Sequence, residues 1–135
     1  MSTPAAVGKR RTPPRRTWAP DRQDVIWIDC NPQIGREMRD IHPFLVLSPR
    51  AFNEKTALVI GLPMTTAEYN ADNLFAVVAG VAQGARSGKT SYVLVHQPKS
   101  FDWRKRRAKA HPLKRLADAP FAEVLARLNR ILLLA

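Results

Sequence analysis

Cysteine is almost absent from this 135-residue sequence, which contains only Cys30. A single cysteine cannot form a disulfide within the chain, so we predict that Cys30 is a small core residue and that the protein works in a reducing cytoplasm. Long apolar runs are absent too, because no segment reaches the roughly 18 apolar residues that a membrane-spanning helix needs. The basic N-terminus also lacks the apolar stretch of a secretory signal. These absences argue against a membrane protein and against a disulfide-stabilised secreted one.

Clusters of metal ligands are missing as well. His42, His96 and His111 are scattered singly, with no cysteine or second histidine at the spacing of a metal site, so we expect no metal and no cofactor. Residues 84–90, GARSGKT, resemble the end of a phosphate-binding loop, but Gln83 stands where that loop needs its first glycine. A strand, and not a helix, is predicted after this segment, which argues against nucleotide binding of that type.

Acidic residues are scarce, with 11 Asp and Glu against 22 Lys and Arg and a formal net charge of +11. Such a charge predicts a polyanionic partner, with nucleic acid first and an acidic protein second. The excess lies in two segments: residues 1–22 carry six basic residues and one acid, and residues 99–115 carry eight basic residues and one acid. Because it includes Trp103, the second segment suits phosphate neutralisation with base stacking, or else it is a solvated, turn-rich segment.

Short apolar strands dominate the rest of the sequence. Continuous or alternating apolar runs predict strands over residues 24–30, 43–48, 56–64, 74–81 and 91–96. One amphipathic helix is predicted from Asp118, its expected N-cap, to the C-terminus. We therefore predict a mainly β fold, either a small barrel or a strongly curled sheet, with a C-terminal helix.

The chain divides into two regions. Residues 1–22 contain four prolines and no periodic pattern. We predict a disordered basic arm there, which is either an RNA tether that uses its charge and Trp18 or a solvated tail. Residues 23–135 form the predicted barrel domain with its helix, since the length supports one core.

Five segments occur in an order that resembles one known family. They are DVIWIDCNPQIGRE, HPFLVLSP, AFNEKT, GLPMTT and HQPKSFDWR, and the resemblance covers residues 23–134. Together they resemble the MazF/PemK toxins of bacterial toxin–antitoxin pairs. The resemblance implies an SH3-like barrel that forms homodimers, and an endoribonuclease that cleaves single-stranded mRNA at short sequences without a cofactor. It also implies an antitoxin whose acidic, flexible tail occupies the RNA groove.

The resemblance also assigns site residues. His42 stands before Pro43, where the family usually has the arginine that is taken to be catalytic, and Thr65 matches the second catalytic position. His96 replaces the usual aspartate before Gln97, and residues 82–90 are the expected insert in a stretch that is longer than usual. The residues that we expect to hold RNA are Gln97, Lys99, Ser100, Trp103, Arg104 and Arg106.

Metal-independent RNA cleavage needs a base for the ribose 2′-OH, an acid for the departing 5′-oxygen and positive charge beside the phosphate. Histidine suits either proton role because its reference pKa is about 6.5, whereas arginine is a fixed cation. We predict that His42 transfers a proton, Thr65 donates to the phosphate, Arg36 supplies a fixed cation, and Glu37 pairs with Arg36 or orients His42. The simpler alternatives are a structural loop histidine, a threonine bonded only to local backbone, solvated loop charges, and a core position for Trp103.

Two other functions stay open at this point. A barrel of this type that has lost catalysis through the change at His42 would only bind RNA or an antitoxin. A toxin of the same fold that acts on a topoisomerase would use a protein–protein contact. The HPF segment and the basic residues 99–115 favour RNA as the target.

Overall fold

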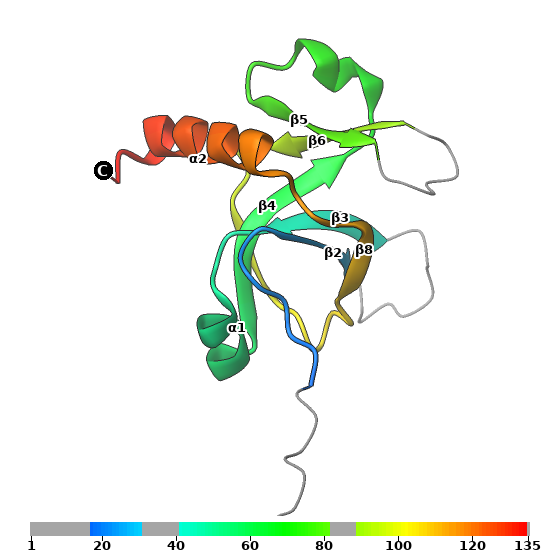
Figure 1. Ribbon diagram of the computed structural model, residues 1–135, viewed down its shortest axis with the longest axis vertical. Helices are drawn as coiled ribbons and strands as arrows, with labels where there is room; N and C mark the ends of the chain where they lie inside the picture. Colours follow the sequence, from blue (N-terminus) through cyan, green and yellow to red (C-terminus); the bar gives the residue numbers. More distant parts are fainter. Residues whose placement is uncertain (1–16, 31–40, 82–88, 135) are drawn as a thin grey trace, which may run out of the picture.

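A curled antiparallel sheet and one long helix make up the protein, as the computed structural model shows for residues 17–30, 41–81 and 89–134 (Figure 1). The order of elements is β2 (Asp24–Asp29), β3 (Ile41–Val46), α1 (Arg50–Thr56), β4 (Leu58–Thr65), the 3₁₀ helix η2 (Glu68–Asp72), β5 (Ala76–Val81), β6 (Thr90–Leu94), β7 (Lys99–Asp102), β8 (Lys109–Arg115) and α2 (Asp118–Leu132). The prediction of a mainly β fold with a C-terminal helix is confirmed.

The strands follow the order β5-β6-β4-β3-β2-β8, and β7 pairs with β4 beside β6. All of the pairings are antiparallel. Because β8 returns to β2, the first and last strands of the described domain lie side by side. Strands β7 and β8 occupy much of the basic segment 99–115, which the sequence pattern left without predicted strands.

Strand β4 changes its partner halfway along. Its first half pairs with β7 through Leu58–Gly61, and its end pairs with β6 through Met64 and Thr65. Pro63 lies at this change, where a residue without an N–H costs the sheet little. Gly61 lies just before it, and a Cβ there would stand 2.0 Å from the carbonyl oxygen of Leu45. The close approach of β3 and β4 therefore depends on this glycine.

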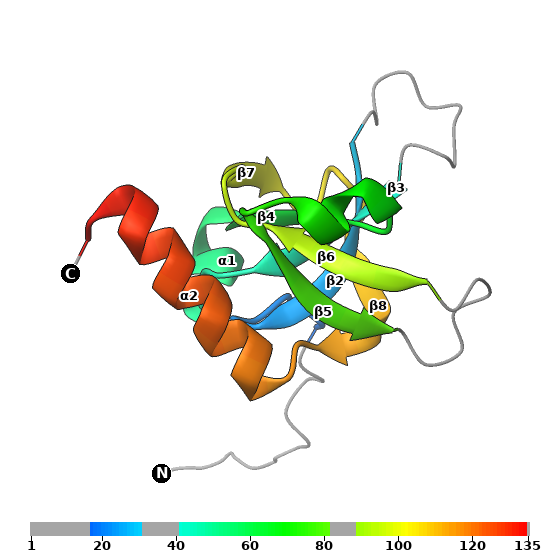
Figure 2. The ribbon, with the colours of Figure 1, turned by 90° about the horizontal axis from the view of Figure 1, so that it is seen from above.

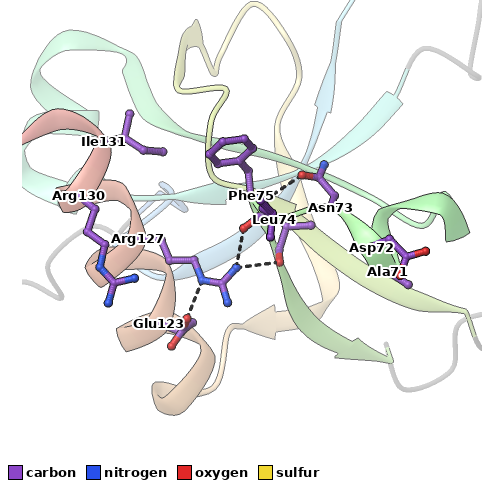
Figure 3. Close-up of a pocket in the computed structure, with 10 residues that line it drawn as sticks. Ala71, Asp72, Asn73, Leu74, Phe75, Glu123, Arg127, Arg130 and Ile131 are labelled. Carbon is purple, nitrogen blue, oxygen red and sulfur yellow. Dashed lines mark hydrogen bonds and ion pairs between the residues drawn. The ribbon is translucent and has the colours of Figure 1, made fainter.

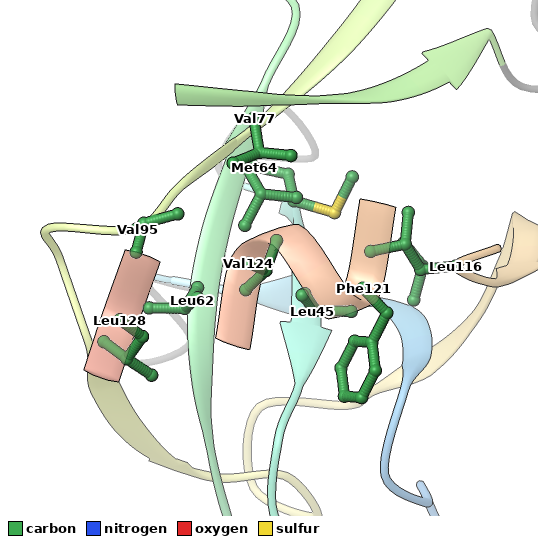
Figure 4. Close-up of a cluster of buried hydrophobic side chains, with 11 residues drawn as sticks. Leu45, Leu62, Met64, Val77, Val95, Leu116, Phe121, Val124 and Leu128 are labelled. Atoms are coloured by element: carbon green, nitrogen blue, oxygen red, sulfur yellow. The ribbon is translucent and has the colours of Figure 1, made fainter. Parts of the chain in front are cut away.

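Two clusters of buried side chains form the core. The larger one lies between the curled sheet and α2, whose Phe121, Val124 and Leu128 supply the helix side (Figure 4). The predicted apolar stripe of α2 thus packs on the sheet up to Leu128, whereas Ile131 and Leu132 at its end are exposed. The predicted N-cap is wrong, because Asp118 is the first helical residue. Its carboxylate accepts a hydrogen bond from the side chain of Gln23 at 2.9 Å.

The smaller cluster lies on the other side of the sheet, near α1, and its members are Ala19, Ile26, Ile28, Phe44, Val46, Val59 and Trp103. Cys30, which we predicted to be a core residue, is half-buried and packs against this cluster. Residues 17–22, which the sequence pattern places in the arm, are in contact with it through the buried Ala19. No helix in the described ranges is long and apolar enough to cross a membrane.

Candidate functional site

A pocket of about 270 Å³ opens where the end of β4 meets the start of β3 and the start of β7. Its walls are mostly apolar, and three polar side chains contribute to the lining. The lining residues are Ile28, Cys30, His42, Pro43, Phe44, Pro63, Met64, Thr65, Leu94, Lys99 and Phe101. An apolar pocket with a few convergent polar groups is the usual form of a ligand site.

The register of the sheet explains why His42 and Thr65 come together. Phe44 pairs with Pro63 in the antiparallel ladder between β3 and β4. Continuing that register by two residues places His42 opposite Thr65, and opposite residues point to the same face of a sheet. Lys99 approaches from the other side of β4, because β7 begins there opposite Gly61. Three strands that are distant in sequence therefore bring an imidazole, a hydroxyl and an ammonium group to one pocket.

The side chain of Thr65 has a local partner as well as a place in the pocket. Its hydroxyl oxygen accepts a hydrogen bond from the backbone N–H of Ala67 at 3.1 Å. This is the local bond that sequence reasoning gave as the simpler alternative. Because a hydroxyl is both donor and acceptor, the bond fixes the oxygen and leaves the proton for a second partner.

The turn after β7 is tied to the wall of the pocket by Arg106. Its guanidinium donates to the backbone oxygen of Cys30 at 2.6 Å and lies over the ring of Phe101, 4.9 Å from the centroid. Both contacted residues line the pocket. Arg106 therefore holds the end of β2 against β7, and this role is structural whatever else the side chain binds.

Trp103 occupies the core position that sequence reasoning left open. Its side chain is only 6% exposed, and its indole N–H donates to the backbone oxygen of Asn53 at 2.8 Å. The guanidinium of Arg104 covers one face of its ring, 4.8 Å from the centroid. A base has no access to this ring in the structure, so Trp103 shapes the turn and does not present a stacking surface.

The remaining predicted residues lie around the pocket or outside the described ranges. Gln97 lies in the turn between β6 and β7, with its side-chain nitrogen 3.3 Å from the His96 ring. Ser100 is exposed on β7 next to Lys99. Arg36 and Glu37 fall within residues 31–40, outside the described part of the chain.

A second and larger hollow, of about 510 Å³, lies between residues 71–76 and the end of α2 (Figure 3). Figure 3 shows Arg127 reaching from α2 to the loop, where its guanidinium donates to the backbone oxygens of Leu74 and Ala76. The same guanidinium pairs with Glu123 at 2.6 Å. Arg127 is thus engaged with the loop and with Glu123. The predicted site residues His42, Thr65 and Lys99 all line the smaller pocket.

Sequence reasoning missed the walls of the pocket. Phe44, Phe101 and Leu94 line it, but the sequence pattern assigned them no role in the site. Phe44 and Phe101 lie two and one residues from His42 and Ser100, within segments that carry the family resemblance, whereas Leu94 lies three residues from Gln97. Among the residues that the structure describes, no three His, Cys, Asp or Glu side chains come together as a possible metal site.

Fold and pocket together define a small basic protein with a curled antiparallel sheet, a C-terminal helix and a mostly apolar pocket at the strand ends. Comparison with known proteins agrees with this class. Residues 21–132 match the family model described as PemK-like, MazF-like toxin of type II toxin-antitoxin system. The chain belongs to this family.

Relatives and solved structures show the same relationship. The endoribonuclease PemK of Escherichia coli is 31% identical over 121 residues, which cover 87% of this chain and 86% of the relative. The endoribonuclease toxin MazF of Escherichia coli strain K12 is 34% identical over 91 residues, or 67% of this chain and 76% of MazF. A MazF crystal structure from Deinococcus radiodurans superposes with a TM-score of 0.68 and 33% identity, covering 86% of this chain and 98% of that one. A MazE-MazF structure from the same organism gives a TM-score of 0.68 at 29% identity, covering 86% and 97%.

Proposed function

We propose that this chain is the toxin of a toxin–antitoxin pair and that it cleaves single-stranded mRNA by a metal-independent attack of the ribose 2′-OH. The observation that carries the proposal is the pocket in which His42, Thr65 and Lys99 meet over apolar walls. A formal net charge of +11 favours a polyanionic substrate. Family membership and relatives named as endoribonucleases support the same reaction.

The reaction assigns one role to each polar group. A base removes the proton of the 2′-OH, the 2′-oxygen forms a bond to the adjacent phosphorus, and the bond from phosphorus to the 5′-oxygen breaks. The departing 5′-oxygen takes a proton, so the products end in a 2′,3′-cyclic phosphate and a 5′-OH. His42 carries one of the two protons, because an imidazole nitrogen can accept a proton and the protonated ring can donate one. Lys99 and the Thr65 hydroxyl stabilise the charge on the phosphate.

Residues around the pocket complete the proposal. Arg36 is the fixed cation beside the phosphate, and Glu37 pairs with it or orients His42. Gln97, Ser100 and Arg104 hold the RNA strand on either side of the cleaved nucleotide. The apolar walls take one base, since a pocket of about 270 Å³ is smaller than the roughly 300–1,000 Å³ pockets of larger ligands.

Assembly and partners follow from the surface. We propose a homodimer that buries the hollow beside α2. The apolar side chains of Leu74, Leu133 and Leu134 are 83%, 78% and 79% exposed, and a second protomer would cover them. An antitoxin with an acidic tail matches the basic surface and competes with RNA for it. We place the protein in the cytoplasm, where mRNA is available.

The test is cleavage of single-stranded RNA in the presence of EDTA, with the product ends identified by mass spectrometry. We expect full activity and products with cyclic phosphate and 5′-OH ends. Activity that disappears on chelation and returns with a divalent ion would exclude the metal-independent reaction. Tight RNA binding without cleavage would favour the inactive binding module instead, and inhibition of a topoisomerase without RNA cleavage would favour the third function.

A further inference from the structure

Phe75, just before β5, is an exposed aromatic residue whose backbone is held by several hydrogen bonds. Its side chain is 45% exposed at the edge of the hollow beside α2 (Figure 3). Its N–H donates to the side-chain oxygen of Asn73 at 2.9 Å, and its carbonyl oxygen accepts the N–H of Val95 at 2.9 Å. The Arg127 guanidinium bonds to the carbonyl oxygens of the residues before and after it. A side chain on so fixed a backbone can bind a ligand with little loss of conformational freedom.

The ring of His96 lies against Phe75. The two ring centroids are 5.0 Å apart and the ring planes are tilted by 32°, which is within the range of offset stacking. The side-chain nitrogen of Gln97 lies 3.3 Å from Nε2 of His96 and contacts the edge of the imidazole. His96 is itself exposed, so part of its ring is open to a ligand. Phe75 and His96 together form a two-ring surface, which we call the aromatic platform.

The aromatic platform lies next to the pocket of the candidate site. His96 and Gln97 are in the turn between β6 and β7, which is closed by a hydrogen bond from the Gln97 N–H to the Leu94 oxygen at 3.2 Å. The last residue of β6, Leu94, and the first residue of β7, Lys99, both line the pocket. His96 is two residues from Leu94, and two residues span at most about 7 Å. A nucleotide that neighbours one in the pocket can therefore reach the platform.

The chemistry of the platform matches a nucleic-acid base. Bases are flat, and they stack on aromatic side chains of single-strand-binding proteins. The Gln97 amide, at the edge of the His96 ring, has donors and an acceptor that can bond to the edge of a base. Lys99, three residues further along, supplies a cation for a phosphate. Stacking, an amide and one cation are the contacts that a single nucleotide needs.

We propose that His96, supported by Phe75, binds the base of a nucleotide adjacent to the cleaved one and determines which base is preferred there. This inference rests on the proposed RNA cleavage and adds a second base-binding position to it. His96 is the specificity-determining residue, because the base stacks on its ring. Phe75 is a positioning residue, because it holds that ring in place. Purines offer a larger ring area for stacking than pyrimidines, so we expect a purine at this position of the RNA.

The experiment removes the two partners of this contact separately and together. The substrates are oligonucleotides with a mapped cleavage site, each carrying one abasic ribose at a different position beside the cleaved nucleotide. An abasic ribose lacks the base but retains the sugar and the phosphate. The variants are His96→Ala, His96→Phe, which keeps an aromatic ring, and Phe75→Ala. Tyr69→Ala is the matched control, since it truncates another aromatic side chain, on η2, that is 79% exposed.

We expect one abasic position next to the cleaved nucleotide to lower kcat/KM of the wild type by about 5- to 150-fold, the range for loss of one base stack. His96→Ala should lower kcat/KM on the intact substrate through KM, and the abasic ribose should then cause little further loss, because both changes remove the same contact. His96→Phe should recover most of the activity, and Phe75→Ala should show a smaller loss with the same dependence on position. Preference for a purine there should disappear in His96→Ala. Tyr69→Ala should match the wild type on every substrate.

Three results would overturn the inference. If the losses from His96→Ala and from the abasic ribose multiply at every position, His96 contacts no neighbouring base, while the proposed cleavage stands. A loss of kcat that is equal on all substrates would place His96 in catalysis or in the fold, and thermal unfolding of the variant separates these two. Unchanged cleavage by Phe75→Ala with an altered mass in ultracentrifugation would assign the platform to a contact between protomers. If the wild type failed to cleave the intact oligonucleotide, the proposed function itself would be wrong, and that outcome is distinct from the other three.

Discussion

His42 carries the sharpest prediction at the scale of single residues. It lines the pocket from β3, together with Thr65 of β4. If it transfers a proton, His42→Ala should lower the rate of RNA cleavage by about 10²–10⁴-fold, the usual contribution of one general acid or base. RNA affinity, measured with a substrate whose 2′-OH is replaced by hydrogen, should change little. A His42→Ala variant that cleaves at the wild-type rate would show that His42 does not transfer a proton.

Replacing His42 with arginine separates two possible roles of the side chain. An Arg at this position supplies a permanent cation but exchanges no proton near neutral pH. If proton transfer is required, His42→Arg should be nearly as inactive as His42→Ala. If only a cation is required, His42→Arg should retain most of the wild-type activity. The cleavage rates of the two variants, measured on the same RNA, decide between these roles.

His111 is the titratable side chain whose burial should make stability depend on pH. It is 6% exposed, its ring lies 4.4 Å from that of Trp27, and its Nδ1 accepts the backbone N–H of Leu113 at 3.0 Å. Burial lowers the pKa of His111 from its ordinary value of 6.5. The unfolded chain therefore binds a proton at a higher pH than the folded chain does. Stability should fall as pH drops below about 6.5, and the fall should level off below the folded pKa.

Thermal unfolding between pH 5 and 8 measures this dependence. His111→Asn retains an acceptor for the Leu113 N–H but cannot be protonated, so its unfolding temperature should vary less with pH than that of the wild type. His96→Asn, at an exposed position, is the matched control and should follow the wild type. If the His111→Asn curve has the same slope as the wild type, another group is responsible.

At the scale of elements, β4 determines the geometry of the site. Its Gly61 lies against β3, and an added Cβ would stand 2.0 Å from the Leu45 oxygen and 2.7 Å from the Phe44 ring. A backbone oxygen cannot move aside as a flexible side chain does, so Gly61→Ala should lower the free energy of unfolding by about 1–3 kcal/mol. Gly80, where nothing lies within 4 Å, has a positive φ and so tests backbone strain separately from steric overlap. Chemical denaturation measures the free energy of unfolding of Gly61→Ala and Gly80→Ala. Because Gly80→Ala reports backbone strain without steric overlap, the loss of stability at Gly61 can be assigned to packing.

The apolar elements could be predicted from the sequence, whereas the basic ones could not. Runs of β-branched and aromatic residues predict strands such as β2 and β6, and an apolar stripe at helical spacing predicts α2. Strand β8 has the sequence KAHPLKR, in which His111 is buried and Leu113 is partly buried. A proline and three cations hide that pattern. Its place in the sheet is set by pairing with β2, which is a contact between distant parts of the chain.

The site residues stay a prediction, although the structure shows how some of them are arranged. The resemblance identified His42, Thr65 and Lys99, and the structure brings these three together. The resemblance does not show which strands bring these residues together, because strand pairing connects distant parts of the chain. The roles of Trp103 and Arg106 were not predictable from the basic segment, since only the fold shows that one is buried and the other bonds to Cys30.

At the scale of the whole molecule, the exposed apolar residues beside α2 test the proposed dimer. Leu74 and Leu134 are 83% and 79% exposed, so they contribute little to the fold of one protomer. Replacing both with Lys should shift the mass measured by analytical ultracentrifugation from dimer to monomer at micromolar concentration. Ala122→Lys, on an exposed face of α2, is the control and should leave the mass unchanged. A wild-type protein that stays monomeric at all concentrations would exclude the dimer.

The walls of the pocket are also part of the core, and this limits how the pocket of this protein can change. Ile28 and Phe44 line the pocket, yet each is only 1% exposed and packs within the smaller core cluster. A mutation that reshapes these walls to accept another base also opens or overfills the core, at a cost of about 1–5 kcal/mol. Selection therefore has little freedom at the walls. If the pocket binds a base as proposed, new RNA preferences should arise at the polar residues that line it, where a substitution leaves the core unchanged.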